Sequence, residues 1–331
     1  GTYALNANTT AANNTAVGLS ALAANTTGTE NTAVGTNALD ANTTGSYNVA
    51  MGMHALGAQT TGSQNAAFGR NALNGNTEGA SNVALGNHAL HSNTTGNNST
   101  AVGYQSLYVS TTGSQNVVVG YQAGVAVTDG ATNTLIGTLC HDNLTTGDLN
   151  TAIGYNLAPS AVGVDSEIVI GSSITGAGTN TVRIGTGGGT ATLGLDGSDT
   201  SWAAASDSRL KKDVADSTVG LSFLNDLRPV TFKWNAKNEV AEDLPQHDAD
   251  SSDPIFGEGK AHHGFIAQEV KAVIDNHSDV LDGNNIWHED PDGTQQLSQG
   301  NLVPMLVKAV QELSAQVEEL KSQPKCKCKG E

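Results

Sequence analysis

The chain has 331 residues, a formal net charge of −17, 39 glycines and only 4% aromatic residues. Residues 1–200 hold ten acidic and two basic side chains, and residues 201–331 hold the remaining 22 and 13. A chain this acidic has no electrostatic attraction for nucleic acid, so we expect no nucleic-acid partner. No run of 18 apolar residues occurs, so the sequence predicts no membrane insertion.

A 17-residue repeat organises the first half of the chain. The five residues NTAVG at 14–18 return as NTAVG at 31–35, NVAMG at 48–52 and NAAFG at 65–69. The glycines that close the repeats are Gly18, Gly35, Gly52, Gly69, Gly86, Gly103, Gly120, Gly137, Gly154 and Gly171, and a looser repeat ends at Gly185. Gly1 fits the same register, so we expect further sequence to precede this chain.

Each repeat predicts short strands and tight turns rather than helices. An apolar pair such as Ala33 and Val34 precedes the glycine, a second pair such as Ala38 and Leu39 follows it, and a turn with the sequence TTG comes next. Because no single repeat can bury its own apolar residues, we expect the coils to stack along one axis. The recurring glycine indicates a positive φ or a close backbone approach at each corner.

The pattern NTAVGxxAL…TTG over residues 1–171 resembles the head repeats of trimeric autotransporter adhesins and the repeat shafts of phage tail fibres. The resemblance implies a mostly β N-terminal part, a trimeric β-roll or β-helix rod of 17-residue repeats. A glycine-rich transition is expected at residues 172–205.

The repeats offer little chemistry. His54 and His88 share one repeat position, which elsewhere holds Ser20, Asn37 or Asn71, so we interpret it as a polar position facing solvent rather than a three-fold metal site. The many Asn and Thr residues suit turns and ladders, with a glycan-binding surface as the alternative. Cys140 stands alone, and Cys326 and Cys328 in the tail lack a histidine partner, so we expect no metal site and no cofactor.

Beyond residue 205 the composition changes to that of a small α+β domain. The sequence predicts a short helix at 217–227, a strand at 228–235, an acidic loop at 239–263 and a helix within 264–276. Asp248, Asp250 and Asp253 fail the spacing of a calcium-binding EF-hand loop, so we interpret that segment as a solvated loop.

The chain ends in a predicted helix at 301–323. Leu302, Leu306, Ala309, Leu313, Val317 and Leu320 recur at steps of three and four, which is typical of a coiled-coil seam. The seam is short, so we expect it to join copies that are already held together elsewhere. Packing of these residues on the rest of their own domain is the alternative.

Four segments occur in the order typical of the intramolecular chaperone of endosialidase family: SDSRLKKDV, LRPVTFKW, GFIAQEV and LVPMLVKAVQEL. The resemblance covers about residues 206–321 within a domain at 206–331, and it implies a trimeric chaperone domain ending in a coiled-coil helix. Members of that family help the preceding β-rod to fold and then cut themselves off through a Ser–Lys dyad.

Carried over by motif, Ser206 is the nucleophile, Lys211 the general base, and Asp207 and Arg209 supporting residues, with the cut between Ala205 and Ser206. Lys211 must be neutral to act, which requires burial or nearby positive charge. The alternative is that Ser206 only caps a helix. At most the resemblance implies one self-cleavage per chain, and we expect no enzyme that turns over an external substrate.

Together these patterns predict a structural virion protein, the distal part of a homotrimeric tail fibre or tail spike used for host attachment. The expected partners are two further copies, a host cell-surface receptor such as a glycan, and other tail proteins bound through the preceding sequence. A trimeric cellular adhesin or surface filament built from the same parts is the alternative.

Overall fold

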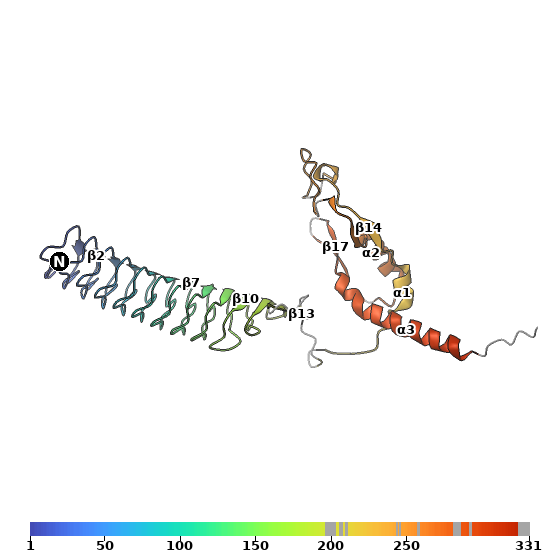
Figure 1. Ribbon diagram of the computed structural model, residues 1–331, viewed down its shortest axis with the longest axis horizontal. Helices are drawn as coiled ribbons and strands as arrows, with labels where there is room; N and C mark the ends of the chain where they lie inside the picture. Colours follow the sequence, from blue (N-terminus) through green and yellow to red (C-terminus); the bar gives the residue numbers. More distant parts are fainter. Residues whose placement is uncertain are drawn as a thin grey trace, which may run out of the picture. The chain divides into compact units, whose positions relative to one another are not determined.

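The computed structural model describes residues 1–195, 203–204, 208, 211–242, 244, 246–256, 259–280, 286–290 and 293–323. The chain divides into two compact units, Gly1–Leu210 and Lys211–Glu331 (Figure 1). The first unit is built from strands and turns, and the second combines short strands with helices. This is the predicted fold class: a β-solenoid followed by a small α+β region and a C-terminal helix.

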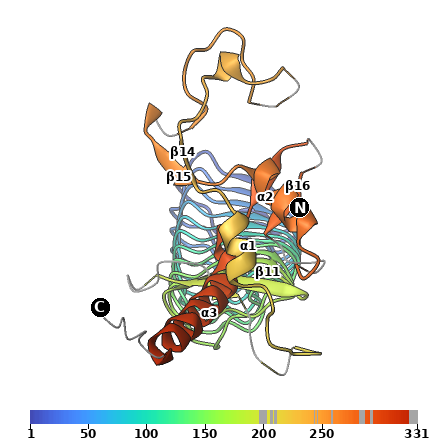
Figure 2. The same cartoon turned by 90° about the vertical axis from the view of Figure 1, so that its right-hand side faces the viewer.

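In the described part of the solenoid, ten parallel strands follow the 17-residue repeat, one strand from each coil. They are β1 (Thr15–Val17), β2 (Thr32–Val34), β3 (Val49–Met51), β4 (Ala66–Phe68), β5 (Val83–Leu85), β6 (Thr100–Val102), β7 (Val117–Val119), β8 (Thr134–Ile136), β9 (Thr151–Tyr155) and β10 (Glu167–Ser172). Each strand pairs with the next in a register of 17 residues, as Ala33 with Ala50 and Ala50 with Ala67. Viewed along the stack, the coils nearly superimpose (Figure 2). The repeat length is therefore the length of one coil.

The parallel stack ends in an antiparallel hairpin. Strand β11 (Thr181–Thr186) still pairs in parallel with β10. Strand β12 (Gly189–Gly194) then runs antiparallel to β11, and β13 (Ala203–Ala204) runs antiparallel to β12. The Arg183 guanidinium joins this hairpin to the last coil: it donates to the carbonyl oxygens of Thr175 and Gly176, at 2.9 and 3.1 Å, and to Thr192 Oγ1 at 3.0 Å. The shorter step before Gly185 belongs to this closing turn.

The core of the solenoid is a thin column of small and medium side chains. In the second coil, Ala33, Ala38 and Leu39 have no exposed surface, and the equivalent residues of the other coils repeat this pattern. Val34 of the first predicted pair points outward instead, because neighbouring residues of a strand face opposite sides. The second residue of that pair is therefore not part of this core.

Buried asparagines form ladders inside the solenoid rather than turns on its surface. Asn82 Nδ2 donates to the Gly96 carbonyl oxygen at 2.8 Å, and its Oδ1 accepts from the Ser99 N–H at 2.9 Å in the next coil. Asn48, Asn65, Asn133 and Asn150 make equivalent contacts. A second ladder includes Asn25, Asn42, Gln59, Asn76 and Asn93. Each ladder satisfies backbone groups that the narrow core would otherwise leave without partners.

The corner glycines meet both predicted requirements. Gly86 has φ +141°, a conformation that is essentially restricted to glycine, and a Cβ placed there would lie 2.4 Å from the Gly103 carbonyl oxygen. The coils also contain non-glycine residues with positive φ, such as His88 at 60° and Leu90 at 48°. The tight turn after Gly86 therefore holds two residues, one of them a core leucine, in the left-handed region of φ.

In its described residues, the C-terminal unit contains three α-helices, two short 3-10 helices and two small antiparallel sheets. Its elements are α1 (Leu221–Asp226), β14 (Val230–Phe232), η2 (Lys237–Glu239), β15 (His262–Gly264), α2 (Ala267–Asn276), β16 (Trp287–Glu289), β17 (Gln295–Leu297), η4 (Gln299–Leu302) and α3 (Val303–Ser322). Strand β14 pairs with β15, and β16 pairs with β17. The buried core is Val219, Phe223, Leu227, Val270, Val280, Ile286 and Leu302.

The elements α1, β14, α2 and α3 lie within the predicted segments but are shorter, whereas the strands β15, β16 and β17 were not predicted. Helix α1 begins four residues later than predicted, and the strand predicted at 228–235 is confined to β14. Proline at 229 has no N–H to donate to a ladder, which favours a strand that starts only after it.

Candidate functional site

Helix α3 has an inner face that packs on its own domain. Leu302, just before the helix, and Ala309 are 5% and 6% exposed, and Met305 packs against the same cluster. On this face the Glu312 Oε2 atom accepts a hydrogen bond from the Leu221 N–H at 2.8 Å. The predicted alternative of packing within one chain therefore holds for Leu302 and Ala309, and these two residues do not belong to the seam.

The outer face of α3 is a continuous exposed apolar row. Val303, Leu306, Val310, Leu313, Val317 and Leu320 are between 41% and 66% exposed. Their steps of three and four residues place valine at every a position and leucine at every d position of a heptad repeat. Compared with the seam predicted from the sequence, this exposed row contains Val303 and Val310 in place of Leu302 and Ala309. The seven-residue spacing of the three valines was the sequence signal for it.

A second exposed apolar row runs along the solenoid. The residue before each corner glycine points outward and is apolar in every coil. The most exposed members of this row are Val17, Met51, Phe68, Leu85, Ile136, Ile153 and Ile184, each between 36% and 56% exposed. A contiguous exposed apolar strip of this kind is typical of a surface for contact with another molecule or copy.

Two of the motifs quoted from the sequence are joined by an ion pair. Arg228, from LRPVTFKW, donates two hydrogen bonds to the Glu269 carboxylate, from GFIAQEV, so the contact is bidentate. The hydrogen bond from Arg228 lowers the pKa of Glu269, and the same bond raises the pKa of Arg228. This pair holds the start of α2 beside the segment that leads into β14.

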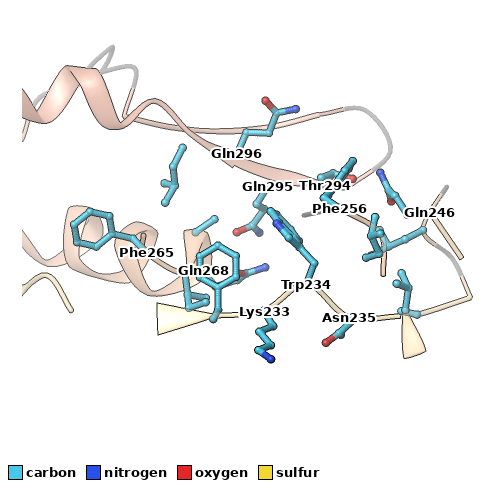
Figure 3. Close-up of a pocket in the computed structure, with 18 of the residues that line it drawn as sticks. Lys233, Trp234, Asn235, Gln246, Phe256, Phe265, Gln268, Thr294, Gln295 and Gln296 are labelled. Carbon is cyan, nitrogen blue, oxygen red and sulfur yellow. The ribbon is translucent and has the colours of Figure 1, made fainter. Parts of the chain in front are cut away.

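A groove of about 790 Å³ lies between the two small sheets of this unit. Its lining includes Phe232 and Trp234, the loop around Phe256, the start of α2 at Gln268, and β17 with Gln295. The Trp234 ring lies 5.1 Å from the Phe256 ring, centroid to centroid, at 78° (Figure 3). No sequence pattern predicts this groove, because its residues are spread over more than 60 positions in the chain.

The predicted dyad lies almost wholly outside the described residues. Ala205, Ser206, Asp207 and Arg209 are not among them, so the distance from the nucleophile to the base is a matter for experiment. Lys211 is described, and its side chain is exposed. It is the first residue of the second compact unit, so the proposed cut lies just before the boundary between the units.

The histidines of the repeats are arranged differently from one another. The His88 ring lies 5.1 Å from His91 and 5.8 Å from Tyr108, centroid to centroid, and burial lowers the pKa of both histidines. His54 lies near Asp40, whose pKa burial raises. Within the described part of the chain, no group of three His, Cys, Asp or Glu side chains could hold a metal ion.

The cysteines differ in setting. Cys140 is buried in the solenoid, where desolvation raises the pKa of its thiol to about 12, so it is not a reactive thiolate at neutral pH. Cys326 and Cys328 lie outside the described residues. None of the helices described in either unit is both long and apolar enough to cross a membrane.

Residues 206–279 match the family model described as the chaperone of endosialidase. The match begins at the predicted nucleophile and includes α1, β14, β15, α2 and the Arg228–Glu269 pair. This segment is a chaperone of endosialidase domain. With the solenoid before it, the chain has the architecture of a tail-fibre-like protein that carries such a chaperone domain at its C-terminal end. Searches of curated proteins and of solved structures found no match.

Proposed function

We propose that this chain is the distal part of a homotrimeric phage tail fibre or tail spike, a virion protein that attaches to the host surface. The chaperone of endosialidase domain brings three copies together, supports folding of the solenoid and then cleaves the chain once between Ala205 and Ser206. The observation that carries the proposal is the exposed a/d row of α3, which a single copy leaves in water.

The shape of that row supports a bundle of more than two helices. Valine at a with leucine at d is a combination that by itself suits two strands. Val307, at position e, is 53% exposed and widens the apolar face to one side. In a three-helix bundle each helix contacts two neighbours, so a wider face is buried there than in a dimer. The outward row of the solenoid would meet its counterparts along the same three-fold axis.

The self-cleavage step follows from the chemistry of the two predicted residues. Lys211 takes the hydroxyl proton of Ser206, and Ser206 Oγ attacks the Ala205 carbonyl carbon through a five-membered ring. The peptide C–N bond breaks, the Ser206 nitrogen takes up the proton, and water hydrolyses the resulting ester. A free lysine has a pKa near 10.4. Lys211 is exposed in one copy, so any burial around it has to come from assembly with the other copies.

The test is intact mass under denaturing conditions together with native mass of the freshly expressed chain. We expect the wild type to form trimers and split at residue 205, whereas Ser206→Ala and Lys211→Arg form whole-length trimers. Leu313→Glu on the outer face of α3 should give uncut monomers. A Leu313→Glu monomer that still cuts itself would disprove the dependence on assembly. A wild-type trimer that stays whole would show that the domain is a permanent part of the tip.

A further inference from the structure

The described lining of the groove between the two small sheets does not include Ser206 or Lys211. None of the residues of the outer α3 row lines it. Its volume of about 790 Å³ lies within the range typical of pockets that enclose a small ligand.

Flat aromatic surface is available in this groove. Trp234 is 40% exposed and Phe256 is 55% exposed, which leaves large apolar side chains in contact with water. Contacts with Phe232, at 5.3 Å and 88°, and with Phe256 hold the Trp234 ring in place. A held indole ring loses little conformational freedom when a ligand stacks on it, which favours binding.

Neutral amides supply the polar part of the lining. Among the described residues, the side chains of Gln246, Gln268 and Gln299 make no hydrogen bond, so their donors and acceptors remain available. Figure 3 shows Gln268 and Gln295 beside the Trp234 ring, whereas Lys233 and Gln296 point away from it. A side-chain amide both donates and accepts, and so does a hydroxyl group.

We propose that this groove binds a neutral oligosaccharide. The weakly positive C–H face of a sugar ring matches the negative face of an indole, and its hydroxyl groups match the unpaired amides. An anionic sugar fits poorly, because Lys233 points outward, Glu239 lies in the lining and the chain has a net charge of −17. The proposal rests on the attachment role given above and assigns part of that role to the chaperone domain while it remains joined to the solenoid.

The experiment uses the full chain carrying Ser206→Ala, so that the two units stay joined. Maltotriose and chitotriose serve as neutral probes and sialyllactose as the anionic one, with saturation-transfer NMR and calorimetry as readouts. We expect at least one neutral trisaccharide to bind with a Kd of about 1 mM or below. Sialyllactose should bind at least about tenfold more weakly.

Variants then locate the binding. Trp234→Ala should weaken it about tenfold or more, and Gln268→Ala about threefold. Tyr121→Ala, an exposed aromatic residue of the solenoid, and Gln316→Ala, on the exposed part of α3, are matched controls that should bind as before. Thermal unfolding checks that each variant is folded. If Trp234→Ala is unfolded, the variant that combines Gln268→Ala with Gln299→Ala tests whether the groove binds the sugar.

Two results would overturn the proposal: no binding of either neutral probe by the folded chain, or binding that the groove variants do not change. Hydrogen exchange on the same sample shows whether a second copy covers the groove, and protection by assembly without sugar binding would also overturn it. Native mass separates this outcome from the proposed function. A trimer that binds no sugar would disprove only the proposal for the groove. A monomer that binds sugar would disprove only the proposed trimer.

Discussion

The carboxylate of Glu312, in the middle of α3, accepts a hydrogen bond from the backbone N–H of Leu221, the first residue of α1, at 2.8 Å. The two residues are 91 positions apart. Gly220 permits the contact, because a Cβ at that position would lie 2.6 Å from Glu312 Oε2. No side chain next to α1 caps its N-terminus, so a residue from another helix provides the cap.

Removing this cap should loosen α1 from α3. We expect Glu312→Ala to lower the free energy of unfolding of the C-terminal unit by about 1–2 kcal/mol, the usual value of an N-terminal cap. Chemical denaturation followed by tryptophan fluorescence measures it. Glu318→Ala, on the exposed side of the same helix, is the control and should change stability by less than about 0.5 kcal/mol. Equal losses from both variants would contradict a capping role.

Neighbouring residues of α3 should give opposite phenotypes. Val310 is 61% exposed on the outer face, so Val310→Asp should dissociate the trimer and leave the monomer folded. Ala309 is 6% exposed on the inner face, so Ala309→Asp should destabilise the unit itself by more than about 3 kcal/mol because it buries an unpaired charge. Native mass and circular dichroism measure the two effects. A Val310→Asp chain that remains trimeric would show that the outer row is not the interface.

The asparagine ladder should tolerate serine far better than an apolar residue. Asn82→Leu leaves the Ser99 N–H buried without a partner, at about 1–3 kcal/mol, and removes one of the two amides that donate to the Gly96 carbonyl. Asn82→Ser keeps an acceptor, as Ser99 already does by accepting from the Asn116 N–H at 3.2 Å, so we expect a smaller loss. Hydrogen exchange of the coils around residue 82 provides the comparison. Equal protection in the two variants would show that the ladder contributes little to stability.

The corner glycines should be the least replaceable residues of the solenoid. Gly86→Ala forces a φ of +141° on alanine and places its Cβ against the Gly103 carbonyl oxygen, so we expect a loss of at least about 2 kcal/mol. Gly188→Ala is the control, because the nearest atom to its Cβ is Thr186 Oγ1 at 3.8 Å. Thermal unfolding of the two variants measures the difference. Similar melting temperatures would show that the coils can shift apart without cost.

Acid should weaken the solenoid through His141. This histidine occupies the position of a core leucine, has no exposed surface, and its two ring nitrogens have no hydrogen-bond partner among the described residues. Burial lowers its pKa from 6.5 to about 4. Below pH 6.5 the unfolded chain binds a proton that the folded chain does not, so stability is complete above pH 6.5 and falls by about 3 kcal/mol towards pH 4.

Unfolding of wild type and His141→Leu between pH 4 and pH 8 tests this effect. The leucine variant should be more stable at low pH and lose most of the slope in this range. His263→Asn, outside the solenoid, controls for the removal of a histidine as such. A slope that is unchanged in His141→Leu would assign the acid sensitivity to other groups.

The sequence by itself determined the solenoid, its coil length and the position of its corners. A repeat of 17 residues with one glycine admits few other structures, because each coil must bury its Ala33-type and Leu39-type residues on identical neighbours. The order of the motifs likewise indicated the chaperone domain, and three of the four motifs lie within the family match at residues 206–279. These features are local or periodic, so they can be predicted from a single amino-acid sequence.

Only the tertiary structure decided which side of each element faces its own domain. Helical spacing alone accommodates both Ala309 and Val310 in an apolar stripe, and the cap formed by Glu312 with Leu221 turns Ala309 inward and leaves Val310 outside. In the same way, strand alternation with parallel pairing buries Ala33 and exposes Val34. The groove at Trp234 depends on contacts between distant segments, and such contacts have no signature in the order of residues.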